Sequence, residues 1–247
     1  MDATAHALPH ATALSRLNDP AEHPFSEIQQ LAIAIRFIVH FGAFHVGMAY
    51  KDASTGQAKL LHFRRHRVVT SDVLGDGGGA LSYHWAALNI PEEIAGIISQ
   101  FCSVFEEKYR AAPSRHVGYG LRYTDGRFNH DPLDFLTNDG CGLTCATFVM
   151  ALLKTYGIEL LRQEEWPKRP EDRPFHELLV QDLATSGADP EHVEAVRKEI
   201  GCARYRPEEV TAAALLGELP IGFVQASALG AEIATGLKQE LASETKS

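Results

Sequence analysis

The sequence predicts an α+β fold, in which a small antiparallel sheet packs on one helix and a mostly helical segment follows. Three observations predict it. Two strand-like segments joined by a turn lie within residues 45–66, and an apolar helix begins near residue 144. The chain after residue 170 carries several helix-like segments in succession. A hairpin that packs on helices belongs to the α+β class.

Length and composition bound the domain organisation. The chain has 247 residues, 45% hydrophobic and 22% charged, with a net charge of −9. This composition is typical of a globular protein, and the negative charge argues against general binding to nucleic acid, which requires a basic surface. We expect a flexible leader at 1–23, a catalytic domain at 24–165 and a helical extension at 166–247 that packs on the same domain.

The first residues contain no basic start followed by an apolar stretch, so no secretory signal is predicted. We expect a cytoplasmic protein, with export by a signal-independent route left open. The stretch LAIAIRFIVHFGAF is interrupted by Arg36 and His40 and is too short to span a bilayer. The four cysteines are expected to be reduced in that compartment: Cys102, Cys141, Cys145 and Cys202.

Hydrophobic spacing predicts the elements of the first half. Apolar residues at three- and four-residue steps over 26–39 favour a helix. Residues 45–50 and 59–66 are predicted strands joined by the turn-rich DASTGQ, and ALSYHWAAL, residues 80–88, is a further strand candidate.

A helix is predicted to start at Pro91, with a stripe that runs from Ile94 to Phe105 and with Cys102 in the core. Residues 113–140 have no clear period and are dense in glycine and aromatic residues. A loop of that length is uncommon unless it has a function. The predicted tail helices cover about 172–186, 190–200, 207–217 and 227–243.

The segment NDGCGLTCATFVMALLKTYGI carries a candidate nucleophile. Thr144 is a good N-cap, Cys145 lies in the first turn, and Gly157 is placed as the C-cap. The positive end of the helix would lower the pKa of the Cys145 thiol and favour the reactive thiolate. Cys141 precedes the helix and lacks this field. The alternative is that Cys145 is a small core residue, since free cysteines are often buried.

A thiol nucleophile needs a base, and histidine is the usual one. His45 opens the strand-like HVGMAY, two residues before Gly47, where it would face a helix N-terminus. His176 and His192 lie in polar helical runs and are expected at the surface. Three further histidines fall in the predicted leader and are expected to be inert: His6, His10 and His23.

These segments resemble the circularly permuted branch of the NlpC/P60 papain-like superfamily, which includes lecithin retinol acyltransferase-like proteins. The likeness consists of HVGMAY, then LLHF, then GLTCATFVMALLKTYGI, in that order. It implies a papain-like fold in which His45 precedes the nucleophile. The family spacing of about twelve residues from the nucleophile to the Gly-Ile at the helix end matches Cys145 to Gly157. From Cys141 the interval is sixteen.

The resemblance also implies a third residue that orients the base. His62 in LLHF matches that place, with His66 or His40 as alternatives. The helical tail has no counterpart in the likeness, so the substrate class stays open.

The resulting hypothesis is a thiol hydrolase that acts on a peptide, amide or ester carbonyl. Cys145 attacks the carbonyl, His45 transfers the proton, and an acyl-enzyme forms. The backbone N–H of Cys145 would bind the oxyanion, with Asn138 or Tyr119 as further donors. Transfer of the acyl group to water gives a peptidase, amidase or deamidase, and transfer to another nucleophile gives an acyltransferase. No metal or organic cofactor is needed.

Two other hypotheses remain open. One is a zinc site built from imidazoles and a thiolate, with ligands drawn from His40, His45, His62 and His66 together with Cys141 or Cys145. The other is a non-catalytic papain-like module that binds a partner through residues 111–140 and the helical tail. The oligomeric state is not predicted.

Overall fold

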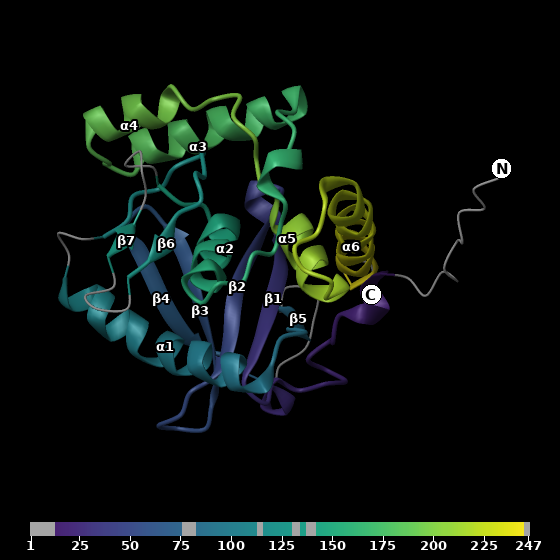
Figure 1. The fold of residues 1–247 in the computed structure, drawn as a ribbon. Helices are drawn as coiled ribbons and strands as arrows, with labels where there is room; N and C mark the ends of the chain where they lie inside the picture. Colours follow the sequence, from purple (N-terminus) through teal and green to yellow (C-terminus); the bar gives the residue numbers. More distant parts are fainter. Residues whose placement is uncertain (1–12, 76–82, 113–115, 130–133, 137–141, 245–247) are drawn as a thin grey trace.

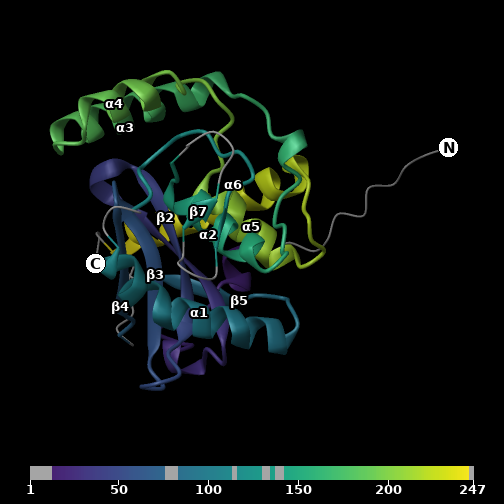
Figure 2. The same ribbon diagram turned by 60° about the vertical axis from the view of Figure 1, so that its left-hand side comes forward.

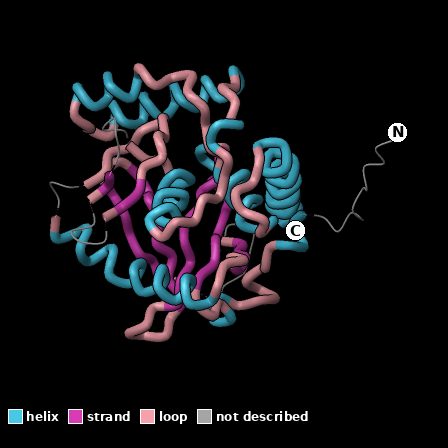
Figure 3. Tube along the Cα trace, in the orientation of Figure 1, coloured by secondary structure: helices cyan, strands magenta, loops and turns pink. Residues whose placement is uncertain are grey.

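A computed structural model describes residues 13–75, 83–112, 116–129, 134–136 and 142–244. The predicted α+β class is confirmed, with an antiparallel five-stranded sheet and helices packed on it (Figure 1, Figure 3). The strands of this sheet are β1 (Leu31–Ile38), β2 (Ala43–Lys51), β3 (Ala58–Arg65), β4 (Val68–Val73) and β5 (His84–Ala87). The helices are α1 (Glu92–Ala111), α2 (Cys145–Thr155), α3 (Arg173–Thr185), α4 (Pro190–Arg197), α5 (Pro207–Leu216) and α6 (Phe223–Glu244).

The strands lie in the order β4-β3-β2-β1-β5. The β1–β2 ladder is long and runs from Leu31↔Tyr50 to Ile38↔Ala43. The β2–β3 ladder is short and runs only from Lys51↔Ala58 to Met48↔Leu61. The first residues of β2 are therefore paired with β1 and lie outside the β2–β3 ladder.

The predicted helix over residues 26–39 is wrong, because Leu31–Ile38 forms β1. This strand is central, and its first five residues are buried whichever face they point to. A strand covered on both faces has no polar alternation, and its continuous apolar run can imitate helical spacing.

The other predicted strands are found, with one omission. Residues 45–50 lie inside β2, residues 59–66 correspond to β3, and β5 lies inside the predicted 80–88 segment. Strand β4 was not predicted, because its sequence VVTSDV alternates weakly; it forms the edge of the sheet. The described part of residues 113–140 contributes the two short strands β6 (Arg127–Phe128) and β7 (Phe135–Leu136).

The other predicted helices, from residue 91 onward, are confirmed in place, and Cys102 is fully buried in the core as expected. The predicted stripe of α1 is wrong at two positions, because Ile97 and Val104 are exposed. Phe101 and Phe105 belong to the same predicted stripe and hold the helix on the sheet as expected, since they are buried in the main core.

The two faces of the sheet carry different covers. The main core contains residues of α1, α2, α5 and α6 together with Ile33, Val46 and Met48 of the sheet. Phe25 and Ile28 cover the opposite face. The predicted flexible leader at 1–23 is corrected for its second half, because Leu17 is buried in the main core. Residues 1–12 lie outside the described residues.

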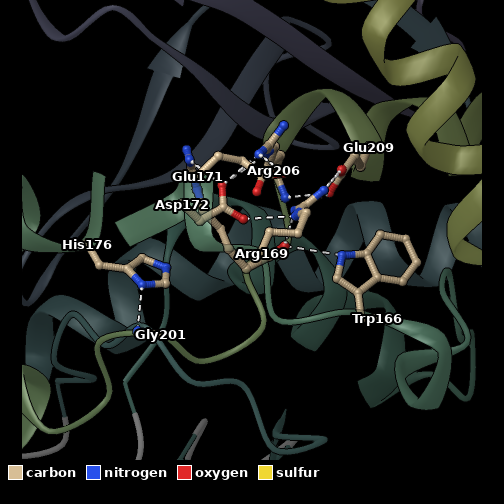
Figure 4. Close-up of polar contacts among 9 residues, drawn as sticks. Trp166, Arg169, Glu171, Asp172, His176, Gly201, Arg206 and Glu209 are labelled. Atoms are coloured by element: carbon tan, nitrogen blue, oxygen red, sulfur yellow. Dashed lines mark hydrogen bonds and ion pairs between the residues drawn. The ribbon is translucent and has the colours of Figure 1, made fainter. Parts of the chain in front are cut away.

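The helical tail joins the same core and adds a separate pair of helices. Figures 1 and 2 show α3 and α4 side by side beyond one end of the sheet. A buried group of charges anchors the start of this tail (Figure 4). Arg169 Nε donates to Asp172 at 2.9 Å, and the same guanidinium bonds Glu209 of α5. Within the described part of the chain, no helix has the length and apolar character needed to cross a membrane.

Candidate active site

Cys145, His45 and His62 line one cavity of about 280 Å³. The cavity lies between the ends of β2 and β3, the start of α2, and helix α3. Its apolar wall consists mainly of Ile38, Phe41, Phe44, Phe175, Leu178, Leu179 and Leu183. Its polar side chains include His40, His66, Tyr119, Thr144, Asp182, Arg36, Arg64, Arg65 and Arg204.

Cys145 occupies the first turn of α2, as predicted. Thr144 caps the helix, because its Oγ1 accepts a hydrogen bond from the Thr147 backbone N–H at 3.2 Å. The Cys145 sulfur accepts a hydrogen bond from the backbone N–H of Val46, next to His45 in β2. The sulfur thus lies beside β2 just beyond the end of the β2–β3 ladder.

The predicted lowering of the Cys145 pKa is wrong. Burial raises the pKa of this thiol, because a thiolate is poorly solvated in a side chain that is 8% exposed. The backbone N–H groups of Val46 and Ala146 and the charge of Arg204 act in the opposite direction but do not overcome burial. The resting residue is therefore a neutral thiol.

His45 and His62 form a directed chain of hydrogen bonds. Nε2 of His62 lies 3.1 Å from Asp72 Oδ2, and a carboxylate only accepts, so this nitrogen carries the proton. Nδ1 of neutral His62 is then an acceptor, and Nε2 of His45 donates to it at 2.8 Å. The proton of His45 is thereby fixed on Nε2, and Nδ1 is left as the basic nitrogen.

Burial keeps both imidazoles neutral. It lowers the pKa of His45 to about 3, assisted by His62 and by the charges of Arg36 and Arg64. Burial also lowers the pKa of His62 to about 4, although Asp72 opposes this shift. Both rings are therefore neutral at neutral pH, and the unprotonated Nδ1 of His45 is available to accept a proton.

The hydrogen bonds of the described residues include none between Cys145 and His45. Side chains alternate along β2, so Val46 points to α2 while His45 and Gly47 point toward the opposite face. The thiol and the imidazole reach the shared cavity from either side of the end of β2. A reaction between them requires the thiol and the imidazole to approach each other when a substrate binds.

The other predicted site residues are placed as follows. Tyr119 lines the cavity, stacks on Phe63, and keeps its hydroxyl proton because burial raises its pKa. Asn138 and Cys141 lie outside the described residues.

Two alternatives for the orienting residue, His66 and His40, line the cavity, but the described residues show no hydrogen bond from either ring to His45. His66 Nδ1 accepts from the backbone N–H of Tyr119. The geometry brings His62 to His45, in agreement with the placement that the resemblance implied.

Sequence reasoning missed Asp72 and Thr70, which face the far nitrogen of His62 at 3.1 and 3.0 Å. The two-residue spacing in VVTSDV would have placed them on one side of a strand, had β4 been predicted. Two histidines expected at the surface are corrected. His176 is buried and accepts from the Gly201 N–H, and His192 bonds the Tyr119 carbonyl at 2.8 Å.

The four histidines of the zinc hypothesis do not converge on one point. Among the described residues, a single group of three side chains brings possible ligand atoms within 4.8 Å of one another, namely Asp19, His84 and Glu240. His84 lies on β5, Glu240 on α6 and Asp19 in the segment before β1, and none of the three lines the cavity. The described residues Cys102, Cys145 and Cys202 are free, as predicted.

Comparisons with known proteins add no relative. No protein-family model, no curated protein and no solved structure matches this chain.

Proposed function

We propose that this protein is a thiol-dependent acyl hydrolase with a permuted papain-like site, in which Cys145 is the nucleophile and His45 the base. One observation carries the proposal. The hydrogen-bond chain from Asp72 through His62 leaves Nδ1 of His45 as a basic nitrogen, in a cavity that the Cys145 thiol also lines.

In the first step the Cys145 thiol and the His45 imidazole both start neutral, so no thiolate–imidazolium ion pair is needed before the attack. As the Cys145 sulfur attacks the carbonyl carbon, the thiol proton passes to His45 Nδ1 and a sulfur–carbon bond forms. The imidazolium is stabilised through His62 toward the Asp72 carboxylate. His45 then gives this proton to the leaving nitrogen or oxygen, and the bond from the carbonyl carbon to that atom breaks.

The second step releases the acyl group. His45 takes a proton from water, the resulting hydroxide equivalent attacks the thioester carbon, and the carbon–sulfur bond breaks. The proton returns to sulfur and regenerates the thiol. The oxyanion of each tetrahedral intermediate would be bound by N–H groups at the start of α2, with the Tyr119 hydroxyl as a side-chain donor. An amine or alcohol in place of water would make the same site an acyltransferase.

Trapping of the acyl-enzyme tests the proposal. The full chain is mixed with an activated acetyl ester such as p-nitrophenyl acetate, quenched in acid, and mapped by peptide mass spectrometry. The expected result is acetylation at Cys145 that is absent from Cys145→Ala and greatly slowed in His45→Ala.

Cys202→Ala is the matched control, since Cys202 is also a free and partly buried thiol. It should be acetylated at Cys145 like the parent protein. Acetylation at Cys202 or His45 alone, or an unchanged rate in His45→Ala, would refute the assignment.

A further inference from the structure

Four arginines and one carboxylate lie among the described residues that line the cavity. Arg36, Arg64 and Arg65 make no ion pair with any carboxylate in the described part of the chain. The fourth, Arg204, is paired with Asp172 outside the cavity wall. The carboxylate, Asp182, lies across the cavity on α3. The wall is therefore cationic in a protein whose net charge is −9.

Among the three arginines without an ion pair, Arg36 is the one most withdrawn from solvent. It is half-buried, and its Nε is shielded from solvent without a hydrogen-bond partner in the described residues. Its guanidinium carbon lies 4.7 Å from the centre of the Tyr83 ring, which supplies only a cation–π contact. A buried donor without an acceptor is costly, so this group is suited to a ligand that accepts hydrogen bonds.

The position of Arg36 ties this charge to the proposed site. Arg36 pairs with His45 in the β1–β2 ladder, so both side chains leave the same face of the sheet. Arg64 comes two residues after His62 on β3 and also acts electrostatically on His45. An anion held between Arg36 and Arg64 would therefore lie next to the imidazole pair.

The rest of the wall is apolar and wraps around this point. Phe41 comes from the β1–β2 connection, Phe44 from the start of β2, and Leu178 and Leu179 from α3. A cavity with an apolar wall and a few converging charged groups fits a small ligand with one charged end.

We propose that the substrate is an apolar organic anion, whose carboxylate or phosphate group binds between Arg36 and Arg64 while its apolar body lies against Phe44 and α3. Calling this ligand a substrate rests on the proposed function, but the binding of the anion does not require catalysis.

Binding is measured with Cys145→Ala, so that chemistry and recognition are separated. Isothermal titration calorimetry compares phenylbutanoate, phenylbutyl phosphate and the neutral phenylbutanol. We expect at least one of the anions to bind about tenfold or more tightly than the alcohol, as charge-assisted hydrogen bonds would give. The tighter of the two anions identifies which headgroup the arginines select. The preference should decrease as salt is added.

Variants in the same background locate the anion. Arg64→Gln, which removes an exposed side chain, and Arg36→Gln should each reduce the preference for the anion about tenfold and leave phenylbutanol unaffected. Arg110→Gln is the matched control, because it removes an exposed arginine of α1 that does not line the cavity, and it should change nothing. Circular dichroism verifies that each variant is folded.

Equal binding of the anions and the alcohol, or no binding of any of them, would overturn the inference. So would an anion preference that survives both substitutions. If the preference holds while no acyl group is found on Cys145, the anion site stands and the proposed hydrolase fails. If Cys145 is acylated and binding shows no preference for anions, the proposed hydrolase stands and the anion site fails.

Discussion

Nε2 of His45 donates to Nδ1 of His62 at 2.8 Å, and this bond joins β2 to β3 beyond the last residue pair of their ladder. The two rings thus bridge the strands at the place where backbone pairing has ended. Because both rings are largely withdrawn from solvent, the bond fixes the tautomer of each. The bond therefore bridges β2 and β3 and also fixes the tautomer of His45, and these two consequences can be tested separately.

Removal of His62, which accepts the hydrogen bond from His45, should lower the rate of Cys145 acylation more than it lowers the stability of the fold. His62→Phe removes the group that holds the proton of His45 on Nε2, so the rate of Cys145 acylation should fall about 10²–10⁴-fold, the usual contribution of acid–base catalysis. The matched control is His40→Phe, which removes an exposed histidine from the same cavity and should leave the rate nearly unchanged. Equal rates for the two variants would show that His62 does not orient the base.

Gly47 determines how closely β3 approaches His45. A Cβ at this position would lie 2.8 Å from His62 Cβ and 3.0 Å from the Leu61 carbonyl oxygen, so backbone would have to move. We expect Gly47→Ala to lower the free energy of unfolding by about 1–3 kcal/mol, as overpacking usually does, and to slow acylation. Urea unfolding measures this, with Gly75→Ala as the control because nothing lies within 4 Å of its Cβ. Equal stability of the two variants would contradict the close approach.

The neutral histidines should make the protein less stable in acid. In the unfolded chain a histidine binds its proton near pH 6.5, whereas the pKa is about 3 for His45 and about 4 for His62 in the fold. Between these values the unfolded state binds more protons, so the free energy of unfolding decreases as the pH falls from 6.5 toward 4.

The comparison of variants isolates this effect from other titrating groups. The double variant His45→Gln/His62→Gln should lose stability less steeply with falling pH than the parent protein, as measured by urea unfolding at several pH values. His40→Gln should keep the parent slope. Parallel curves for the double variant and the parent would mean that the buried pair does not resist protonation.

The candidate site was more predictable from the sequence than the sheet that supports it. Thr144 followed by an apolar stripe was enough to place Cys145 in the first turn of α2, because capping and periodicity are local properties. Whether that thiol is ionised was not predictable, since the answer depends on how much chain covers it. The local field of the helix is present, and burial by distant segments outweighs it.

Burial by segments that are distant in the sequence also explains the other wrong predictions. Leu31–Ile38 imitates a helix because both faces of β1 are covered, by α5 and α6 on one side and by Phe25 and Ile28 on the other. His176 looks like a surface residue in a polar helical run, yet it is buried where α3 meets the segment around Gly201. In each case the pattern within the element was observed correctly, and the neighbour that covers it was unknown.

The Cys145 thiol should react slowly with iodoacetamide. Because burial raises its pKa, the alkylation rate should keep rising at pH values above about 8.5, the ordinary value for cysteine. Arg204→Gln should push the rise to still higher pH, because the Arg204 charge stabilises the thiolate. Peptide mass spectrometry at several pH values measures the rate at Cys145, with Cys202 as the internal reference. A midpoint below 8.5 would indicate a primed thiolate and would contradict the neutral resting state.

The buried charges that anchor the tail should be essential for stability. Arg169 bonds both Asp172 and Glu209, and all three side chains are at least nine-tenths buried (Figure 4). Glu209→Gln leaves the guanidinium without one of its charged partners, and breaking a buried pair in this way usually costs about 3–5 kcal/mol. Glu177→Gln breaks the exposed pair with Arg173 and should change the free energy of unfolding by less than about 1 kcal/mol. If urea unfolding gives the two variants the same stability, the tail is held by its apolar contacts alone, and the position of Arg204 at the cavity does not depend on the buried charges.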